Sequence, residues 1–127
     1  WNSGPGFELA IDNSTVTNQG TFTISSDVDG ITETGVSGFT NSGSLVVDTT
    51  GAATIDGSLV NTGNLDIRQG TLTIASGSLT LGGGSLTGAG TLASNLIADS
   101  GSTVSPGNSA GILSINGNVF IRPLQNR

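Results

Sequence analysis

The chain has 127 residues, a net charge of −6 and neither cysteine nor histidine. Without cysteine it has no disulfide framework and no thiolate metal site, and its negative charge disfavours electrostatic binding to nucleic acid or anionic lipid. No apolar run is long enough to cross a bilayer as a helix, so we expect no membrane span. The chain begins without methionine, which suggests a processed protein or a piece of a longer one.

The apolar residues are few but regularly placed. They make up 34% of the chain, beside 21 glycines. Such a mixture is also typical of disordered segments, but only 9% of the residues are charged and the apolar positions are periodic. A narrow core that repeats along an axis accounts for both features. The composition therefore predicts a repeat protein.

Residues 1–15 begin with a Gly-Pro-Gly turn at positions 4–6, after which apolar residues alternate from Phe7 to Ile11. We expect an irregular start or cap in this segment. The repeats themselves are predicted over residues 16–121, and residues 122–127 are predicted to form a tail.

One motif occurs three times, at residues 16–24, 39–47 and 59–67, with successive copies 23 and 20 residues apart. Stacked coils would place its asparagines in a ladder, in which each side chain bonds the backbone of the neighbouring coil. Its glycines are expected to supply positive φ angles at the corners. A looser fourth copy at residues 86–92 has Gly88 in the place of the asparagine. The three close copies pair Asn18 with Gly20, Asn41 with Gly43, and Asn61 with Gly63.

Short strands recur throughout the chain with one outline, in which a glycine and a small or polar residue precede two apolar residues at alternate positions. They occur at residues 20–24, 43–47, 51–55, 63–67, 70–74, 77–81 and 111–115. Helical periodicity is absent, and each interior glycine would cost a helix about 1 kcal/mol. We therefore predict an all-β fold, a parallel β-helix (β-solenoid) of about six coils of roughly 20 residues each.

Residues 88–120 resemble the C-terminal part of bacterial autotransporter passenger domains and related surface adhesins. The resemblance rests on GTL at 90–92, SPGNS at 105–109, GIL at 111–113 and NGN at 116–118. Together with the upstream repeats, it extends over about residues 16–121. It implies that the β-helix is right-handed and that the protein is secreted or displayed on a bacterial surface.

Most nucleophilic and general-base mechanisms are unavailable to a chain without histidine, cysteine, lysine and tyrosine. Asp27, Asp29 and Glu33 are the weak candidates for paired-carboxylate hydrolysis of a polysaccharide or for calcium binding. A solvated acidic turn between strands explains the same residues, and we favour it. We therefore predict a protein that is not an enzyme, with no catalytic residue, no metal and no cofactor.

Two further groups of polar residues are predicted to face outward. Asp66 and Arg68 are expected to form an exposed pair, which contributes about 0–1 kcal/mol. Threonines at alternate positions, in the pairs 21/23, 32/34 and 71/73, suggest an ice-binding surface. Threonine is also simply a favourable residue on the outer side of a strand, and we prefer that explanation.

The two ends of the chain differ in charge, because residues 1–33 contain acids and no arginine whereas residues 100–127 contain arginines and no acid. The ends of a solenoid expose unpaired backbone edges, and opposite charges there favour head-to-tail association into a filament. Aromatic residues that cap their own monomer are the alternative. The candidate assembly residues are Trp1, Phe7, Glu8, Phe120, Arg122 and Arg127.

These observations predict a non-enzymatic, extracellular structural protein, the β-helix segment of a bacterial surface adhesin or fibre. Its expected partners are further copies of itself, bound end to end, and host or surface glycans. The alternatives are a carbohydrate-active or carbohydrate-binding β-helix that uses acidic surface residues, and an ice-binding solenoid.

Overall fold

The computed structural model describes residues 8–25, 30–35, 37–107 and 111–123. The described chain is all-β, and its strands form one 13-stranded sheet in which every neighbouring pair is parallel. The strands are β1 (Glu8–Asp12), β2 (Thr15–Asn18), β3 (Thr21–Ile24), β4 (Gly30–Thr34), β5 (Gly38–Asn41), β6 (Ser44–Ile55), β7 (Leu59–Asn61), β8 (Asn64–Leu81), β9 (Ser85–Gly88), β10 (Thr91–Asp99), β11 (Thr103–Pro106), β12 (Ser114–Ile115) and β13 (Val119–Arg122).

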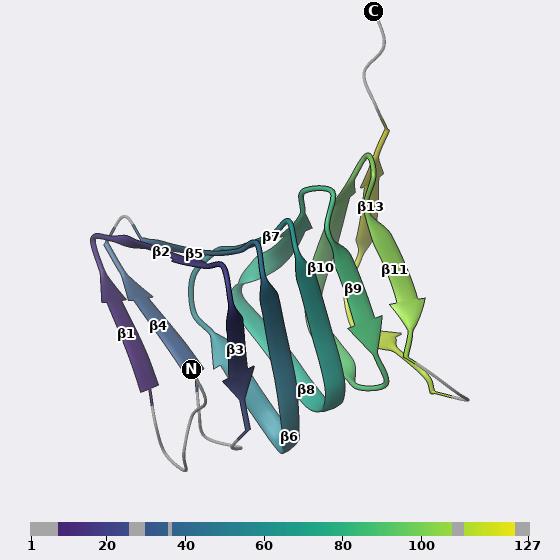
Figure 1. Ribbon diagram of the computed structural model, residues 1–127, viewed down its shortest axis with the longest axis horizontal. Coiled ribbons are helices and arrows are strands. Elements are labelled where there is room, and N and C mark those ends of the chain that lie inside the picture. The colour runs from purple at the N-terminus through teal and green to yellow at the C-terminus, as the bar shows by residue number, and fades with distance from the viewer. Residues whose placement is uncertain (1–7, 26–29, 36, 108–110, 124–127) are drawn as a thin grey trace, which may run out of the picture.

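The chain winds as a right-handed parallel β-helix of about five turns, with β1 at one end and β11 and β13 at the other (Figure 1). The predicted fold is confirmed, and the turn count is close to the six expected. Asn18 and Asn41 occupy the same place in successive coils and are 23 residues apart. The later spacings along the same face are 20, 20, 17 and 23 residues, so the coils vary in length around the expected ~20.

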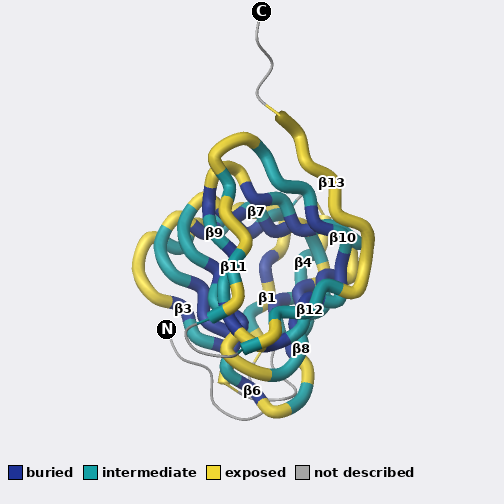
Figure 2. The backbone as a smooth tube through the Cα atoms, turned by 90° about the vertical axis from the view of Figure 1, so that its right-hand side faces the viewer, coloured by how far each residue is buried: buried dark blue, intermediate teal, exposed yellow. Residues whose placement is uncertain are grey.

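Each coil contributes to three faces. The first face contains β1, β4 and β12, together with the C-terminal part of β6, the middle of β8 and the N-terminal part of β10. The second face contains β2, β5, β7, β13 and the C-terminal parts of β8 and β10. The third face contains β3, β9, β11 and the N-terminal parts of β6 and β8. Viewed along the axis from the C-terminal end, the three faces close into a ring (Figure 2).

The core consists of columns of apolar side chains that point into this ring. On the second face, one column runs from Val16 through Phe39, Leu59, Leu79 and Leu96 to Val119. Four of these six side chains are at most 1% exposed, and only the ends of the column are open to solvent. Alternation explains the pattern, because successive residues of a strand point to opposite sides. β1 begins at Glu8 and pairs with β4, in the stretch where the alternation of apolar residues indicates a strand.

The three motif asparagines end β2, β5 and β7 and stack in register at the corner between the second and third faces. The Nδ2 of Asn18 donates to the Oδ1 of Asn41 at 2.8 Å, and the Nδ2 of Asn41 donates to the Oδ1 of Asn61 at 2.7 Å. Each amide also donates to a carbonyl oxygen of the next coil, that of Ser44, Asn64 or Ser85. Asn41 and Asn61 are fully buried. The next position in this column is Leu81, where the amide ladder stops.

The glycines of the motif have a different role from the one expected. Gly20, Gly43 and Gly63 do not adopt positive φ. A Cβ atom at Gly43 would instead overlap the Gly20 carbonyl oxygen of the preceding coil, and a Cβ atom at Gly63 would overlap that of Gly43. At Gly20 the corresponding space is open, with nothing within 4 Å. Close stacking of backbones, rather than turn geometry, therefore requires glycine at the second and third positions.

The fourth copy of the motif is also placed differently from the prediction. Gly88 pairs with Ile67 on the third face, whereas the residue beside Asn61 is Leu81. Gly88 has a φ of 123°, and a Cβ atom there would overlap the carbonyl of Ile67. The corner at the start of the third face, with Gly43 and Gly63, and the corner at its end, with Gly88, both bring two backbones close together. A glycine-based pattern therefore does not distinguish one corner from the other.

Candidate functional site

The acidic residues that the sequence offers as candidates for catalysis or calcium binding do not come together in the described part of the structure. Asp27 and Asp29 lie outside the described residues, and Glu33 lies in β4 on the first face. The Oε2 of Glu33 accepts a hydrogen bond from the backbone N–H of Gly57 at 3.1 Å, whereas its Oε1 is buried without a partner. Within the described ranges, no three carboxylates lie close enough together to hold a metal ion.

Burial raises the pKa of Glu33 above its usual value, and the nearby Asp56 carboxylate raises it further. The backbone N–H groups of Gly57 and Ser58 act in the opposite direction, because they stabilise the charged form. The side chain is held against the backbone of the next coil through its Oε2. This arrangement explains Glu33 as a structural residue.

Glu33→Gln should change how stability depends on pH. A raised pKa in the folded state means that stability is highest below the pKa of the unfolded chain and falls as the pH rises through the folded pKa. The variant lacks this titration, so it should gain stability relative to the parent as the pH rises over the same interval. Urea unfolding from about pH 3 to pH 8 measures the difference. Glu8→Gln on β1 is the control, and a pH-independent difference for Glu33→Gln would contradict the assignment.

A polar groove lies on the third face. It has a volume of about 360 Å³ and is bordered by β8, β9 and β11 and by the segment that follows β11. Asp66, Thr87 and Ser105 occupy successive coils at one register position, so three outward side chains align along the groove. Arg68 contributes the only positive charge among the lining residues, which are Asp66, Arg68, Thr87, Gly88, Ala89, Ser105, Pro106 and Gly107.

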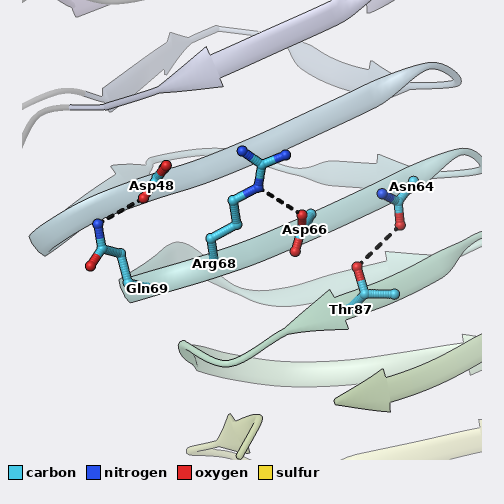
Figure 3. A network of polar contacts seen from close by, with 6 residues as sticks. All are labelled: Asp48, Asn64, Asp66, Arg68, Gln69 and Thr87. Carbon is cyan, nitrogen blue, oxygen red and sulfur yellow. Dashed lines mark hydrogen bonds and ion pairs between the residues drawn. The ribbon is translucent and has the colours of Figure 1, made fainter. Parts of the chain in front are cut away.

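Polar contacts hold the side chains around this groove (Figure 3). The Nε of Arg68 donates to Asp66 Oδ2 at 3.0 Å, and the arginine side chain is 58% exposed. The hydroxyl of Thr87 donates to Asn64 Oδ1 at 3.4 Å, next to Asp66. An exposed ion pair of this kind contributes about 0–1 kcal/mol, so the guanidinium can exchange its partner at little cost. The groove offers hydrogen-bond donors and acceptors to a polar ligand and has no activated nucleophile among its lining residues.

The sequence anticipated the outward Asp66 and Arg68 but did not indicate the groove. The groove depends on Ser105, Pro106 and Gly107, which lie two coils further along the chain. The register between successive coils brings these residues together. The sequence could have revealed it only if the lengths of the intervening coils were known.

The threonine pairs do not combine into one surface. Thr21 and Thr23 lie on the third face in β3, whereas the pairs 32/34 and 71/73 lie on the first face. On the first face, Thr73 has Thr54 on one side but Ala93 on the other. A regular outward threonine array is therefore absent from the described part of these faces.

The candidate assembly residues lie at opposite ends of the solenoid where they are described. Glu8, in β1, accepts a hydrogen bond from the Thr32 hydroxyl of the next coil. At the other end, Arg122 in β13 donates from Nε to Asp99 Oδ1 at 2.5 Å, so its charge is already compensated. Phe120, in the same strand, is 50% exposed. Trp1, Phe7 and Arg127 lie outside the described residues.

Comparison with protein-family models, with curated proteins and with solved structures gives no match to this chain. In the described residues there is no helix of the length and apolar character that crossing a membrane would need. The class of protein is defined by the fold itself, a β-solenoid repeat protein.

Proposed function

We propose that this chain is a non-enzymatic structural protein, the β-helix segment of a bacterial surface adhesin or fibre that acts outside the cell. The observation that carries the proposal is the continuous core together with the amide ladder. Buried columns run through successive coils, and Asn18, Asn41 and Asn61 tie the coils together along the axis. Such a rod resists local opening, because each interior coil is paired with a neighbour on both sides.

The resemblance of residues 88–120 to passenger domains of surface adhesins supports the extracellular part of the proposal. The chemistry of the lateral faces is consistent with it. The groove has hydroxyl and charged groups but no activated nucleophile. Glu33, the carboxyl group with a raised pKa, accepts a hydrogen bond from a backbone N–H group through Oε2. These features suit a surface that binds rather than reacts.

The test is to locate the chain and to measure its resistance to unfolding. Antibodies raised against the purified protein should label intact cells of the source organism, and mild protease treatment of those cells should release the protein. Pulling on single molecules should give unfolding in steps of about one coil, roughly 20 residues. Labelling only after the cells are permeabilised would overturn the surface assignment. An activity on polysaccharide that the purified chain retains would overturn the non-enzymatic one.

A second candidate function is glycan binding at the groove on the third face, which the alignment of Asp66, Thr87 and Ser105 favours. Its volume of about 360 Å³ lies within the usual range for small-ligand sites, about 300–1,000 Å³. The charged pair would bind hydroxyl groups or an acidic sugar through charge-assisted hydrogen bonds.

Arg68→Ala should weaken glycan binding at this groove about 10-fold or more, because it removes a charged hydrogen-bond donor. Saturation-transfer NMR against neutral and acidic oligosaccharides measures the effect. Gln69→Ala is the matched control, since Gln69 is the next residue but bonds Asp48 outside the groove. Binding that survives Arg68→Ala, or its absence in the parent chain, would exclude the groove as a glycan site.

A further inference from the structure

The groove on the third face lies along the side of the rod and not at either end. It is bordered by β8, β9 and β11, which are neighbours in three successive coils. Coils stack along the axis of a solenoid, so a further coil would extend this face and would not lie across it. The groove is therefore a lateral feature of the β-helix, and the polar atoms that line it indicate which class of ligand it fits.

The hollow arises from a decrease in side-chain size between coils. Arg68, Ala89 and Gly107 each follow directly after residues that are paired in register. The wall is therefore high at the arginine and low in the next two coils. Ala89 and Pro106 add apolar atoms to the lining, against which the C–H groups of a sugar ring can pack.

The two hydroxyl groups of the groove already use their hydrogen atoms within the protein. Thr87 donates to Asn64 Oδ1 at 3.4 Å, and Ser105 donates to the carbonyl oxygen of the residue that follows it at 3.0 Å. The backbone N–H groups of Ala89 and Gly107 donate to carbonyl oxygens of the preceding coil. A hydroxyl group has one donor and two acceptor lone pairs. Both hydroxyls therefore present acceptors to a ligand.

Asp66 adds a further acceptor. Its Oδ2 accepts a hydrogen bond from Arg68 Nε at 3.0 Å, whereas its Oδ1 has no donor in the described part of the chain. In Figure 3 this second oxygen lies on the side of Thr87, and the guanidinium lies on the opposite side, toward the strand of Asp48. Arg68 thus holds the carboxylate in place, while its terminal nitrogens are directed away from the aligned hydroxyls.

The acceptors form a row along the axis. Asp66, Thr87 and Ser105 are in register in successive coils, and neighbouring strands are about 4.8 Å apart, so the row is about 10 Å long. A ligand that lies along it must supply a hydrogen-bond donor at each step. The hydroxyl groups of a sugar chain supply such donors, whereas an ionised carboxylate has acceptors only.

Charge gives the same preference. The lining residues carry one negative and one positive charge, those of Asp66 and Arg68. They provide no net attraction for an ion of either sign, and the whole chain has a net charge of −6, which disfavours the approach of an anion. An uncharged hydroxyl group, in contrast, makes a charge-assisted hydrogen bond when it donates to a carboxylate.

We propose that the groove binds an uncharged oligosaccharide, which lies along the axis and donates its hydroxyl groups to Asp66, Thr87 and Ser105. Arg68 is a positioning residue, because it acts on the ligand through Asp66. The inference rests on the glycan binding proposed above for this groove, and it adds the charge of the ligand and the direction of its hydrogen bonds.

The test compares uronic-acid oligosaccharides of several linkages, each before and after chemical reduction of its carboxylates to hydroxymethyl groups. The two forms differ only in that group. Titrations of the full chain followed by NMR should show that the reduced, uncharged form binds at least about 10-fold more tightly. The preference should become smaller as the salt concentration rises from about 0.05 to about 0.5 M, because screening weakens the repulsion of the acidic form.

Variants assign the contacts. Asp66→Asn should weaken binding of the uncharged form about 10-fold, because it removes the charged acceptor. Ser105→Ala should give a smaller loss, about 3-fold, because it removes a neutral acceptor. Asp48→Asn is the matched control, since Asp48 accepts a hydrogen bond from Gln69 and lies outside the lining, and it should leave binding unchanged. Urea unfolding of each variant shows whether it folds as the parent does.

The possible results separate this inference from the function on which it rests. If the acidic forms bind as tightly as the reduced forms, or more tightly, the ligand class is wrong, while glycan binding at the groove stands. If a folded Asp66→Asn variant binds as the parent does, the row of acceptors is not the contact. If neither form of any oligosaccharide binds to the parent chain, both the inference and the glycan site are overturned.

Discussion

Replacing Gly43 or Gly63 with alanine is expected to lower the free energy of unfolding by about 3 kcal/mol, whereas the same change at Gly20 should be nearly neutral. The three glycines occupy equivalent positions of one repeated motif, so composition and local sequence predict equal effects. Only the stacking of the coils distinguishes them.

The difference follows from what a methyl group would meet. At Gly43 the Cβ atom would lie 2.6 Å from the carbonyl carbon of Gln19, and at Gly63 it would lie 2.6 Å from that of Ser42. These atoms belong to the backbone of the preceding coil, which strand pairing holds on both sides of the corner. Relief would therefore require the coils to separate. Gly20 has no such neighbour within 4 Å, and alanine there reduces only the conformational freedom of the unfolded chain.

Urea unfolding followed by far-ultraviolet circular dichroism measures the three variants under one set of conditions. We expect a large loss in the free energy of unfolding for Gly43→Ala and Gly63→Ala, and a change within about 0.5 kcal/mol for Gly20→Ala. If Gly20→Ala is as destabilising as the other two changes, then turn geometry, and not contact between coils, is the reason that these positions require glycine. A similar small effect at all three positions would mean that the coils are spaced more widely than the structure shows.

The sequence predicted the parts of the fold that depend on local alternation. The strands, the inward residues such as Leu65 and Leu72, and the common position of the three asparagines all follow from spacings within one repeat. Each of these features is repeated with a period that the chain displays directly. Alternation of side chains and the ~20-residue repeat are sufficient to predict a β-solenoid.

Features that depend on the length of individual coils could not be predicted in the same way. Gly88 was assigned to the asparagine corner, but the next coil brings Leu81 to that position and moves Gly88 to the column of Ile67. The groove has the same origin, since it requires the register between coils. The charge of Arg122 could not be interpreted either, because its partner Asp99 lies one coil earlier.

The amide ladder gives the second large effect. Asn41→Leu is expected to destabilise the fold by about 3 kcal/mol, and Asn61→Leu by about half as much. Both side chains are fully buried and leucine is similar in size, so burial and volume predict equal costs for the two changes. The ladder predicts unequal costs, because Asn41 lies in its middle and Asn61 at its end.

Removing the amide of Asn41 takes the side-chain donor from two acceptors, the buried Oδ1 of Asn61 and the part-buried carbonyl oxygen of Asn64. When the amide of Asn61 is removed, the carbonyl oxygen of Ser85 loses its side-chain donor. Asn41 Nδ2 still donates to the carbonyl oxygen of Asn64 at 2.9 Å. A leucine at position 61 would also lie beside Leu81, the apolar residue that already follows in the column. Asn61→Leu thus shortens the ladder by one step, whereas Asn41→Leu interrupts it.

Thermal and urea unfolding of the two variants and of the double variant decide between these descriptions. In the double variant, the Oδ1 of Asn61 is no longer present to be left without a donor. The loss of stability in the double variant should therefore be about 1 kcal/mol smaller than the sum of the two single losses. Equal single costs that add fully would mean that each asparagine acts independently through its own coil. Unequal, non-additive costs would show that the side-chain amides couple successive coils, which is the property a rod needs if force applied at one end is to be carried along its length.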